Sequence, residues 1–476
     1  MNERERVAHV ARKLGFGAPW AGEEPKTARE AVERLLSFQA GDELAWPDRK
    51  RIFESANGQL DSAGGPVQRF WTAQMLLTPY PLREKLALFW HSWFAVSRAK
   101  VVLGPVLLDY LQTLRHKGAG RFEELLADVA LGPAMMLYLD LDQSLRGRPN
   151  ENLARELLEL FSLGIGNYSE QDVLEATRTL TGSGVIVSWR TLGKTDAERL
   201  AKYAAGEPAA YSYYSAGAHD SRPQTILGQT KDRTPRELVA ELAAHPATRR
   251  RVCERLWQYF VREEAPRRAI ERMEQAYTRT DGEIRSVLGA MTDAPEFWEP
   301  ASVRSLPSSP ADFTIGMLRR LRLDERLSGL AGEPIPDLTR RVLAVVHQRM
   351  ARQGLELLAP EDVSGWRWGR AWFSPAGMAA RFALKPLSIF GPRYDRPWCA
   401  MLQRSLADAS PQRDEDAAAW LLALVDAPQD QALRAAVVEE TQRRGLARIV
   451  LQTDPFLLWA ESCLQLVCAC PAAHMV

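Results

Sequence analysis

The sequence predicts a mainly α-helical protein, a large multi-helix body with a small extended or β insertion around residues 185–228. Three observations support this fold class. Apolar residues recur at helical spacing through most of the chain. Helix start signals (Ser, Asn or Pro) precede these segments, and Gly residues follow them. The Val-, Ile- and Tyr-rich runs that are typical of strands are concentrated in the insertion.

The first 130 residues contain several helical patterns. An amphipathic helix is expected over 28–38, where Ala31, Val32, Leu35 and Leu36 share one side. The Thr78–Pro81 segment reads as a break between two later helices. The remaining helices of this part are expected at residues 67–77, 83–100, 104–116 and 122–129.

Beyond residue 165, one capping motif and the extended segments set the pattern. Ser169, with Asp172 three residues later, forms a capping box that opens another helix. Residues 185–187 and 211–214 are expected to be extended, and residues 225–228 to pair with them. Helices then resume from Pro235 to about Thr292, and further helices are expected at 312–323, 337–352, 417–424 and 431–445.

A Ser- and Pro-rich stretch, Ser305–Pro310, is the best candidate for a linker. It divides the chain into a main helical domain, residues 1–300, and a C-terminal helical region, residues 301–476, packed on the first. The C-terminal region also contains a tryptophan-rich loop at 365–372. Two units of this size are ordinary for domains.

The composition excludes several classes of function. Lys and Arg total 61 against 60 Asp and Glu, so the chain has no general attraction for nucleic acid. No apolar run approaches the roughly 18 residues of a membrane span. Met1–Arg6 has mixed charges and no apolar segment after it, so we expect no secretion signal and a cytoplasmic protein. Five cysteines in 476 residues fit a reducing compartment.

The most informative stretch is Pro149–Leu160. Pro149 and Asn150 stand before a leucine-rich run, which predicts a helix start with Asn150 as its cap. Gly164 and Gly166 are expected to end this helix. Five polar side chains fall within an arc of roughly 140° on such a helix: Glu151, Asn152, Arg155, Glu156 and Glu159.

This polar face has two interpretations. Carboxylates with an amide and an imidazole suit a divalent metal such as Mn²⁺, Fe²⁺, Zn²⁺ or Mg²⁺. Glu156 and Glu159, three residues apart, project together as in the metal sites of helical bundles. The expected metal ligands are His91, Glu151, Asn152, Glu156 and Glu159. Alternatively, a buried ion-pair network of Glu151, Arg155 and Glu159 locks helices together without a metal.

Two histidines are candidates for the same site. His91 lies between two alanines on the helix expected at 83–100, so a ligand or another element can approach it closely. The alternative is a packed histidine bonded to a backbone carbonyl. His219 and Asp220 are adjacent and can face one cavity as a general base or as metal ligands. The alternative is a turn in which Asp220 caps the local backbone.

No other motif indicates a known chemistry. The sequence lacks a Gly-x-Gly-x-x-Gly fingerprint, a Walker-type loop and a Gly-x-Ser-x-Gly elbow, so we expect no nucleotide cofactor. Trp366, Trp368 and Trp372 suit either a stacking platform for a sugar or base, or buried anchors of their loop.

Eight motifs occur in one order along the chain: Phe89–Phe94, Pro133–Asp140, Asn150–Leu160, Tyr168–Val173, His219–Asp220, Leu227–Gly228, His245–Thr248 and Pro360–Trp366. In this order they resemble the bacterial family catalogued as domain of unknown function 1800 (DUF1800). The resemblance runs from about Val7 to the C-terminal region.

The resemblance implies little about chemistry, because the family has no settled activity. Its members often look exported and are often encoded beside a sulfatase-like protein, which is therefore the partner that the resemblance implies. This chain is expected to depart from the family in having no export signal. It also has Phe161 where many members carry histidine, so no ligand is expected at that position.

Two hypotheses of function follow. The first is a metal-assisted enzyme, hydrolytic or oxidative, acting on an unknown substrate, with Glu156 or Asp220 as the base. Its expected catalytic residues are Arg155, Glu156, His219 and Asp220. The alternative is a non-catalytic helical scaffold or partner-binding protein. In it, the helix predicted within Pro149–Leu160, which we call the motif helix, carries a structural ion-pair network. The two differ in whether His91 and His219 reach the Glu156 helix.

Overall fold

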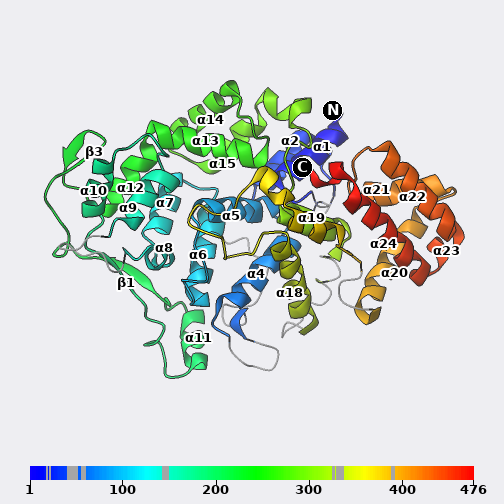
Figure 1. Ribbon diagram of the computed structural model, residues 1–476, viewed down its shortest axis with the longest axis horizontal. Helices are drawn as coiled ribbons and strands as arrows, with labels where there is room; N and C mark the ends of the chain where they lie inside the picture. The colour runs from blue at the N-terminus through cyan, green and yellow to red at the C-terminus, as the bar shows by residue number, and fades with distance from the viewer. Residues whose placement is uncertain are drawn as a thin grey trace.

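A computed structural model describes residues 1–17, 20, 23–39, 52–54, 61–141, 150–323, 327, 337–387 and 392–476. Within these residues the chain is mainly helical, as predicted. The strands of this part form two small two-stranded sheets. Figure 1 shows helices on every side of a helical centre, with the strands at one edge.

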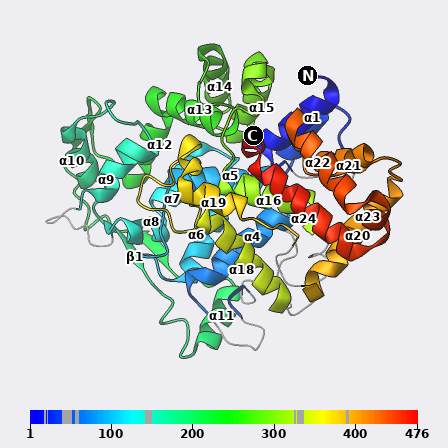
Figure 2. The ribbon, with the colours of Figure 1, turned by 45° about the vertical axis from the view of Figure 1, so that its right-hand side comes forward.

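Three helices occupy the centre of the molecule in both views (Figures 1 and 2): α4 (Gly64–Leu77), α5 (Pro81–Trp93) and α6 (Gly104–Lys117). Every residue of α5 from Leu82 to Trp93 is buried. A helix that is buried all round belongs to the core of a large body. α5 therefore provides the surface on which the other elements are assembled.

The helix predicted at 83–100 is too long at its C-terminal end. α5 ends at Trp93, and Phe94 is its C-terminal cap. Four residues later the backbone N–H of Arg98 donates to the carbonyl oxygen of Leu358 at 2.8 Å. This contact with the second half of the chain takes the place of a further helical turn.

Two groups of helices flank the centre. On one side lie α7 (Phe122–Ala130), α8 (Pro133–Tyr138), α12 (Pro235–Ala244), α13 (Pro246–Phe260), α14 (Arg267–Arg279) and α15 (Ile284–Thr292). On the other lie α20 (Pro392–Asp408), α21 (Asp414–Leu424), α22 (Gln431–Arg444), α23 (Leu446–Leu451) and α24 (Thr453–Ala469), the orange and red group at the right of Figure 1. The centre and these two groups form one continuous apolar core.

The β insertion is confirmed, but its pairing differs from the prediction. β1 (Ser183–Ile186) pairs with β2 (Tyr211–Tyr214), and α11 (Asp196–Ala204), which was not predicted, lies between them in sequence. β3 (Gln224–Ile226) pairs instead with β4 (Gln229–Lys231). Leu227 and Gly228 have φ of 50° and 77°, the positive values of a two-residue hairpin turn. Because of this turn, β3 pairs with β4, the strand that follows it directly in the chain, and not with β1 or β2.

The predicted linker is a buried seam. Leu306 and Val476 exchange backbone N–H···O bonds of 3.1 and 2.8 Å, and Ser308 N–H donates to the carbonyl of His474 at 2.7 Å. From α1 (Glu3–Leu14), Lys13 Nζ reaches Ser305 Oγ at 3.0 Å. The two ends of the chain therefore meet here, as Figures 1 and 2 show. The division into domains at residue 300 stays a prediction.

The C-terminal half also packs directly on the centre. α16 (Pro310–Arg320) and α18 (Asp337–Arg352) both contact α4, and α2 (Ala28–Leu36) and α1 contact α5. α18 begins and ends where the sequence predicted. In the part of the chain that the structure describes, no helix combines the length and the apolar character that crossing a bilayer requires.

Candidate functional site

The predicted motif helix forms, but its hydrogen-bond pattern changes halfway. α9 covers Asn152–Glu156, and the following turn, Leu157–Phe161, is a π-helix. The N-cap is Glu151 and not Asn150 as predicted, because the helix begins one residue later; the Oδ1 of Asn150 still accepts from the backbone N–H of Asn152 at 3.0 Å. Pro149 lies outside the described residues. A π turn rotates the side chains that follow it relative to a regular α-helix, and such turns are frequent at functional sites.

The two glutamates on either side of this change lie near other acidic groups. Tyr168 donates its hydroxyl to Glu159 Oε2 at 2.7 Å. Burial, with Glu159 and Asp362 nearby, raises the pKa of Glu156. Asp362 belongs to the loop that precedes the tryptophans. The pKa of Tyr138 is raised as well, by burial and by the charges of Asp362 and Glu156. Segments distant in sequence thus form one acidic cluster.

The structural alternative expected buried ion pairs on this face, but they lie in solvent, and one partner differs from the prediction. Arg155 Nη2 lies 2.9 Å from Glu170 and 3.4 Å from Glu151. Glu170 is the first residue of α10 (Glu170–Thr179), so Arg155 joins two helices, as the structural alternative expected. Glu159, expected in this network, bonds to Tyr168 instead. Asn152 is exposed.

His91 lies in the core of the molecule and contacts aromatic rings. Its ring stacks on that of Trp366 with centroids 4.8 Å apart, and Trp71 and Tyr110 lie at 5.4 and 5.6 Å. Burial lowers the pKa of His91 to about 3. Neither ring nitrogen has a hydrogen-bond partner among the described residues. At neutral pH this histidine is an uncharged ring within an aromatic stack.

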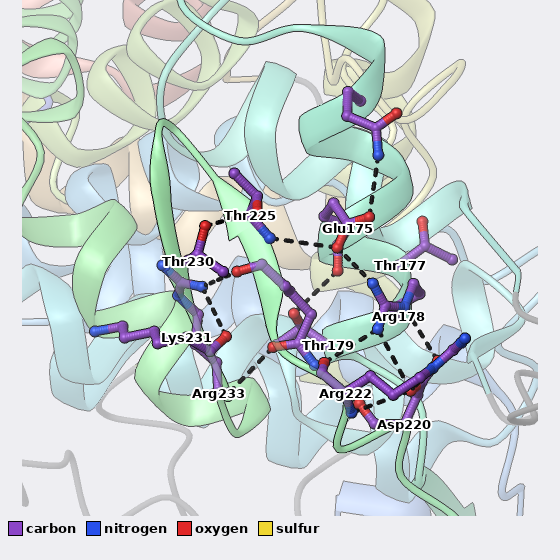
Figure 3. A network of polar contacts seen from close by, with 12 residues as sticks. Glu175, Thr177, Arg178, Thr179, Asp220, Arg222, Thr225, Thr230, Lys231 and Arg233 are labelled. Atoms are coloured by element: carbon purple, nitrogen blue, oxygen red, sulfur yellow. Dashed lines mark hydrogen bonds and ion pairs between the residues drawn. The ribbon is translucent and has the colours of Figure 1, made fainter.

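His219 and Asp220 make structural contacts that connect neighbouring chain segments. Figure 3 shows the contacts of Asp220. His219 Nδ1 lies 3.0 Å from the carbonyl oxygen of Thr181. Asp220 accepts from Nε of Arg222 at 2.8 Å and from Nε of Arg178 at 3.1 Å. These two guanidinium groups hold the pKa of Asp220 well below its usual range. A carboxylate held in this way is a poor base, and here it joins α10 to the loop before β3.

The structure does not assemble the predicted metal centre. Of its five expected ligands, Glu156 and Glu159 lie together, whereas His91 is packed among rings and Glu151 pairs with Arg155. Across the described ranges, no group of three or more His, Cys, Asp or Glu residues is placed to hold a metal ion. A metal on Glu156 and Glu159 would need its further ligands from water or from a substrate.

A cavity of about 250 Å³ lies between α5, α13 and the tryptophan-rich loop, and we call it the tryptophan pocket. Its aromatic lining comes from Tyr259, Trp366, Trp368 and Trp372. Its polar lining comes from Ser92, Arg255, Gln258, Glu263, Ser309 and Asp312. An apolar wall with a few polar groups is typical of small-molecule sites. The volume, just below the usual range for drug-sized ligands, suits a single ring.

α5 fixes the tryptophan-rich loop, which crosses it in Figure 1. Gly365 has φ of 84°, and a Cβ at this position would lie 2.1 Å from the carbonyl oxygen of Ser92, so only glycine fits. Trp368 Nε1 donates to Ser92 Oγ at 2.6 Å. Trp366 is held by its stack on His91. Trp366 is therefore a buried anchor of the loop and Trp368 a half-buried one, and both also line the pocket.

The cation in the pocket is Arg255 of α13. Its guanidinium carbon lies 4.5 Å from the ring centroid of Trp368 and 5.9 Å from that of Trp93. Burial lowers its pKa, although an arginine stays charged in proteins. Among the described residues no carboxylate forms an ion pair with it. A half-buried guanidinium without a carboxylate favours the binding of an anion.

Sequence reasoning did not identify the residues that α13 contributes. Arg255, Gln258 and Tyr259 have the i, i+3, i+4 spacing of one helical face. That spacing was available in the sequence, but nothing in it showed that the face meets the tryptophans. The contact between α13 and the tryptophan-rich loop is a tertiary contact, which only the folded structure shows.

Comparison with known proteins supports the resemblance found in the sequence. The family model described as "Protein of unknown function (DUF1800)" matches residues 9–472. No curated protein matches the chain, and no solved structure matches it.

Proposed function

We propose that this chain, which belongs to the DUF1800 family, binds a small ring-shaped polar compound that carries a negative charge. The observation that supports this function is the lining of the tryptophan pocket. Three tryptophans and Arg255, which has no carboxylate partner in the described part of the chain, face one cavity.

The lining matches a sugar acid in particular. The C–H face of a sugar ring is apolar and packs on indole rings, and Trp366 and Trp368 both line the pocket. Gln258 and Glu263 provide acceptors and donors for hydroxyl groups. Arg255 can bind a carboxylate through two parallel N–H···O bonds. A hexuronate such as glucuronate therefore serves as the model ligand, and glucose is its neutral counterpart.

Ligand-observed NMR with glucuronate tests this function. We expect saturation transfer with the wild type, and about tenfold weaker binding in Trp368→Ala, because a ring stack and its buried area are lost. Trp298→Ala is the matched control, since this half-buried tryptophan contacts the buried His9 and Phe297 and does not line the pocket. Equal binding by the two variants would contradict the proposal.

A second function rests on the acidic cluster. The raised pKa of Glu156 makes it a candidate general acid or base of an enzyme, in agreement with its predicted catalytic role. Elemental mass spectrometry on the wild type and Glu156→Gln tests the metal-assisted form of this proposal. A stoichiometric divalent metal that disappears in the variant would support it. Metal-free protein in both cases would leave an acid–base role for Glu156 without a metal.

The catalytic roles of Arg155, His219 and Asp220 and the sulfatase-like partner stay predictions. The contacts of Arg155 and Asp220 are ion pairs with neighbouring chain segments, which favours structural roles for both.

A further inference from the structure

Three arginines converge on one aspartate where the two ends of the chain meet. Arg12 Nη1 lies 2.9 and 3.0 Å from the carboxylate oxygens of Asp426. Nη2 of Arg304 and of Arg320 lie 3.3 and 3.5 Å from the same carboxylate. Arg12 lies in α1 and Arg304 directly precedes the Ser305–Pro310 segment. Arg320 is the last residue of α16, and Asp426 lies in the loop after α21. Figures 1 and 2 both place α1, α21 and the C-terminus in this part of the molecule.

The recess between these side chains has an excess of positive charge. Asp312 also lines it, but Lys85 Nζ lies 2.8 Å from Asp312 Oδ1. Three guanidinium groups therefore share the carboxylate of Asp426. The side chains of Arg12 and Arg320 are 8% and 14% exposed, and that of Asp426 is 29% exposed. The recess is thus buried at its base and reaches solvent beside the aspartate.

The other walls of the recess are apolar. Phe313, Met317 and Val425 lie among its lining residues. Apolar walls keep water out and strengthen the field of the arginines. Burial lowers the pKa of Arg304 to about 10, because the charged guanidinium loses hydration free energy in the recess. An additional anion would offset that loss.

The backbone at the recess is strained at two positions. Arg304 and Asp426 have φ of 47° and 50°, in the left-handed region that residues with side chains rarely adopt. The two residues also contact each other, since Arg304 Nη2 donates to the backbone carbonyl of Asp426 at 2.6 Å. Strained residues tend to cluster at functional sites. Here the guanidinium of Arg304 is held at the recess by its contacts with the backbone carbonyl oxygens of Met475 and Asp426 and with the Asp426 carboxylate.

We infer that this arginine recess binds a monoatomic anion, with chloride as the physiological ligand. The cavity has a volume of about 20 Å³, which is enough for one water-sized species. A halide ion is only slightly larger than water, and the recess opens to solvent beside Asp426, whereas phosphate and sulfate, with four oxygens around a central atom, are much larger. The three arginines and Asp426 do not line the tryptophan pocket, so the inference does not depend on the function proposed there, although Asp312 borders both cavities.

Thermal unfolding at constant ionic strength tests the inference, with chloride progressively replacing gluconate, an anion too large for the recess. We expect the wild-type Tm to rise by about 2 °C and to reach a plateau, because a ligand that binds only the folded state stabilises it. Arg304→Gln should lose this rise. Arg396→Gln should keep it, since Arg396 is 60% exposed, pairs with Asp454 and is not among the residues that line the recess.

Bromide gives a second and direct readout. It should replace chloride in the wild type and give an anomalous scattering peak between the three guanidinium groups in a crystal. If Arg304→Gln does not fold, Arg320→Gln takes its place in the thermal series. Equal Tm values in chloride and gluconate, or a rise that is linear and identical in all variants, would overturn the inference, as would a recess without bromide.

Discussion

Helices α5 and α9 were predicted to build one site, and the structure places them in opposite environments. α5 is buried from Leu82 to Trp93, including its charged residues. On α9, the ion pair of Arg155 joins it to a glutamate that is 75% exposed. A conspicuous polar motif is therefore not the same as a buried polar site. Here the less conspicuous helix, α5, holds both the aromatic stack and the loop that lines the pocket.

The largest expected effect on stability comes from the buried ion pair of α5. Glu84 accepts from Arg115 Nε at 3.0 Å and from Arg83 Nε at 3.1 Å, and all three side chains are buried. Glu84→Ala leaves two guanidinium groups without this carboxylate, and we expect it to lower the free energy of unfolding by about 3–5 kcal/mol. Urea unfolding measures the loss. If the free energy of unfolding fell only as little as expected for a substitution at an exposed residue, the contrast between the buried α5 and the exposed α9 would be contradicted.

The pH dependence of stability tests the environment of His91. Its pKa is about 3 in the folded state and about 6.5 when unfolded, so the unfolded chain binds an extra proton between these values. Stability is therefore complete above pH 6.5 and falls by about 1.4 kcal/mol per pH unit below it. His91→Phe should remove this part of the slope in urea unfolding at several pH values. An unchanged slope would place His91 in contact with water.

The smallest expected effect comes from the motif helix. Arg155→Ala removes ion pairs with exposed partners, and exposed pairs contribute little to stability. Its Tm should stay close to that of the wild type, and the small difference should shrink further in high salt. Unfolding of this variant would instead favour the predicted structural network as the main support of the fold.

The fold class was predictable because most helices are amphipathic. α18 matches its predicted bounds, and the capping box of Ser169 and Asp172 forms at the start of α10. α24 was not predicted, because a helix buried on several sides lacks a regular polar face. α5 shows the same difficulty in its polar residues. Arg83, Glu84 and Lys85 look like a solvated run, and they are buried because each finds a partner.

The candidate site was predictable only in part. The sequence identified the three tryptophans and offered anchoring or stacking as their roles. The contacts that define the pocket join Ser92 to Trp368 and Arg255 to Trp368, across 276 residues in the first pair. No local pattern contains such long-range contacts. The predicted convergence of His91 and His219 on Glu156 was an inference from residue type, and the fold directs the two histidines elsewhere.

The central claim is that Arg255 selects a negatively charged ring in the tryptophan pocket. Isothermal titration calorimetry of glucuronate and of glucose tests it most directly, with the wild type, Arg255→Gln and Arg250→Gln. Arg250 lies on the same helix, is 56% exposed and pairs with Glu254, so it is the matched control.

We predict that the wild type and Arg250→Gln prefer glucuronate by about tenfold or more, since a hydrogen bond to a charged group contributes about 1.5–3 kcal/mol. Arg255→Gln should bind both compounds with similar, weak affinity. Equal affinities in the wild type, or a preference that persists in Arg255→Gln, would contradict the account.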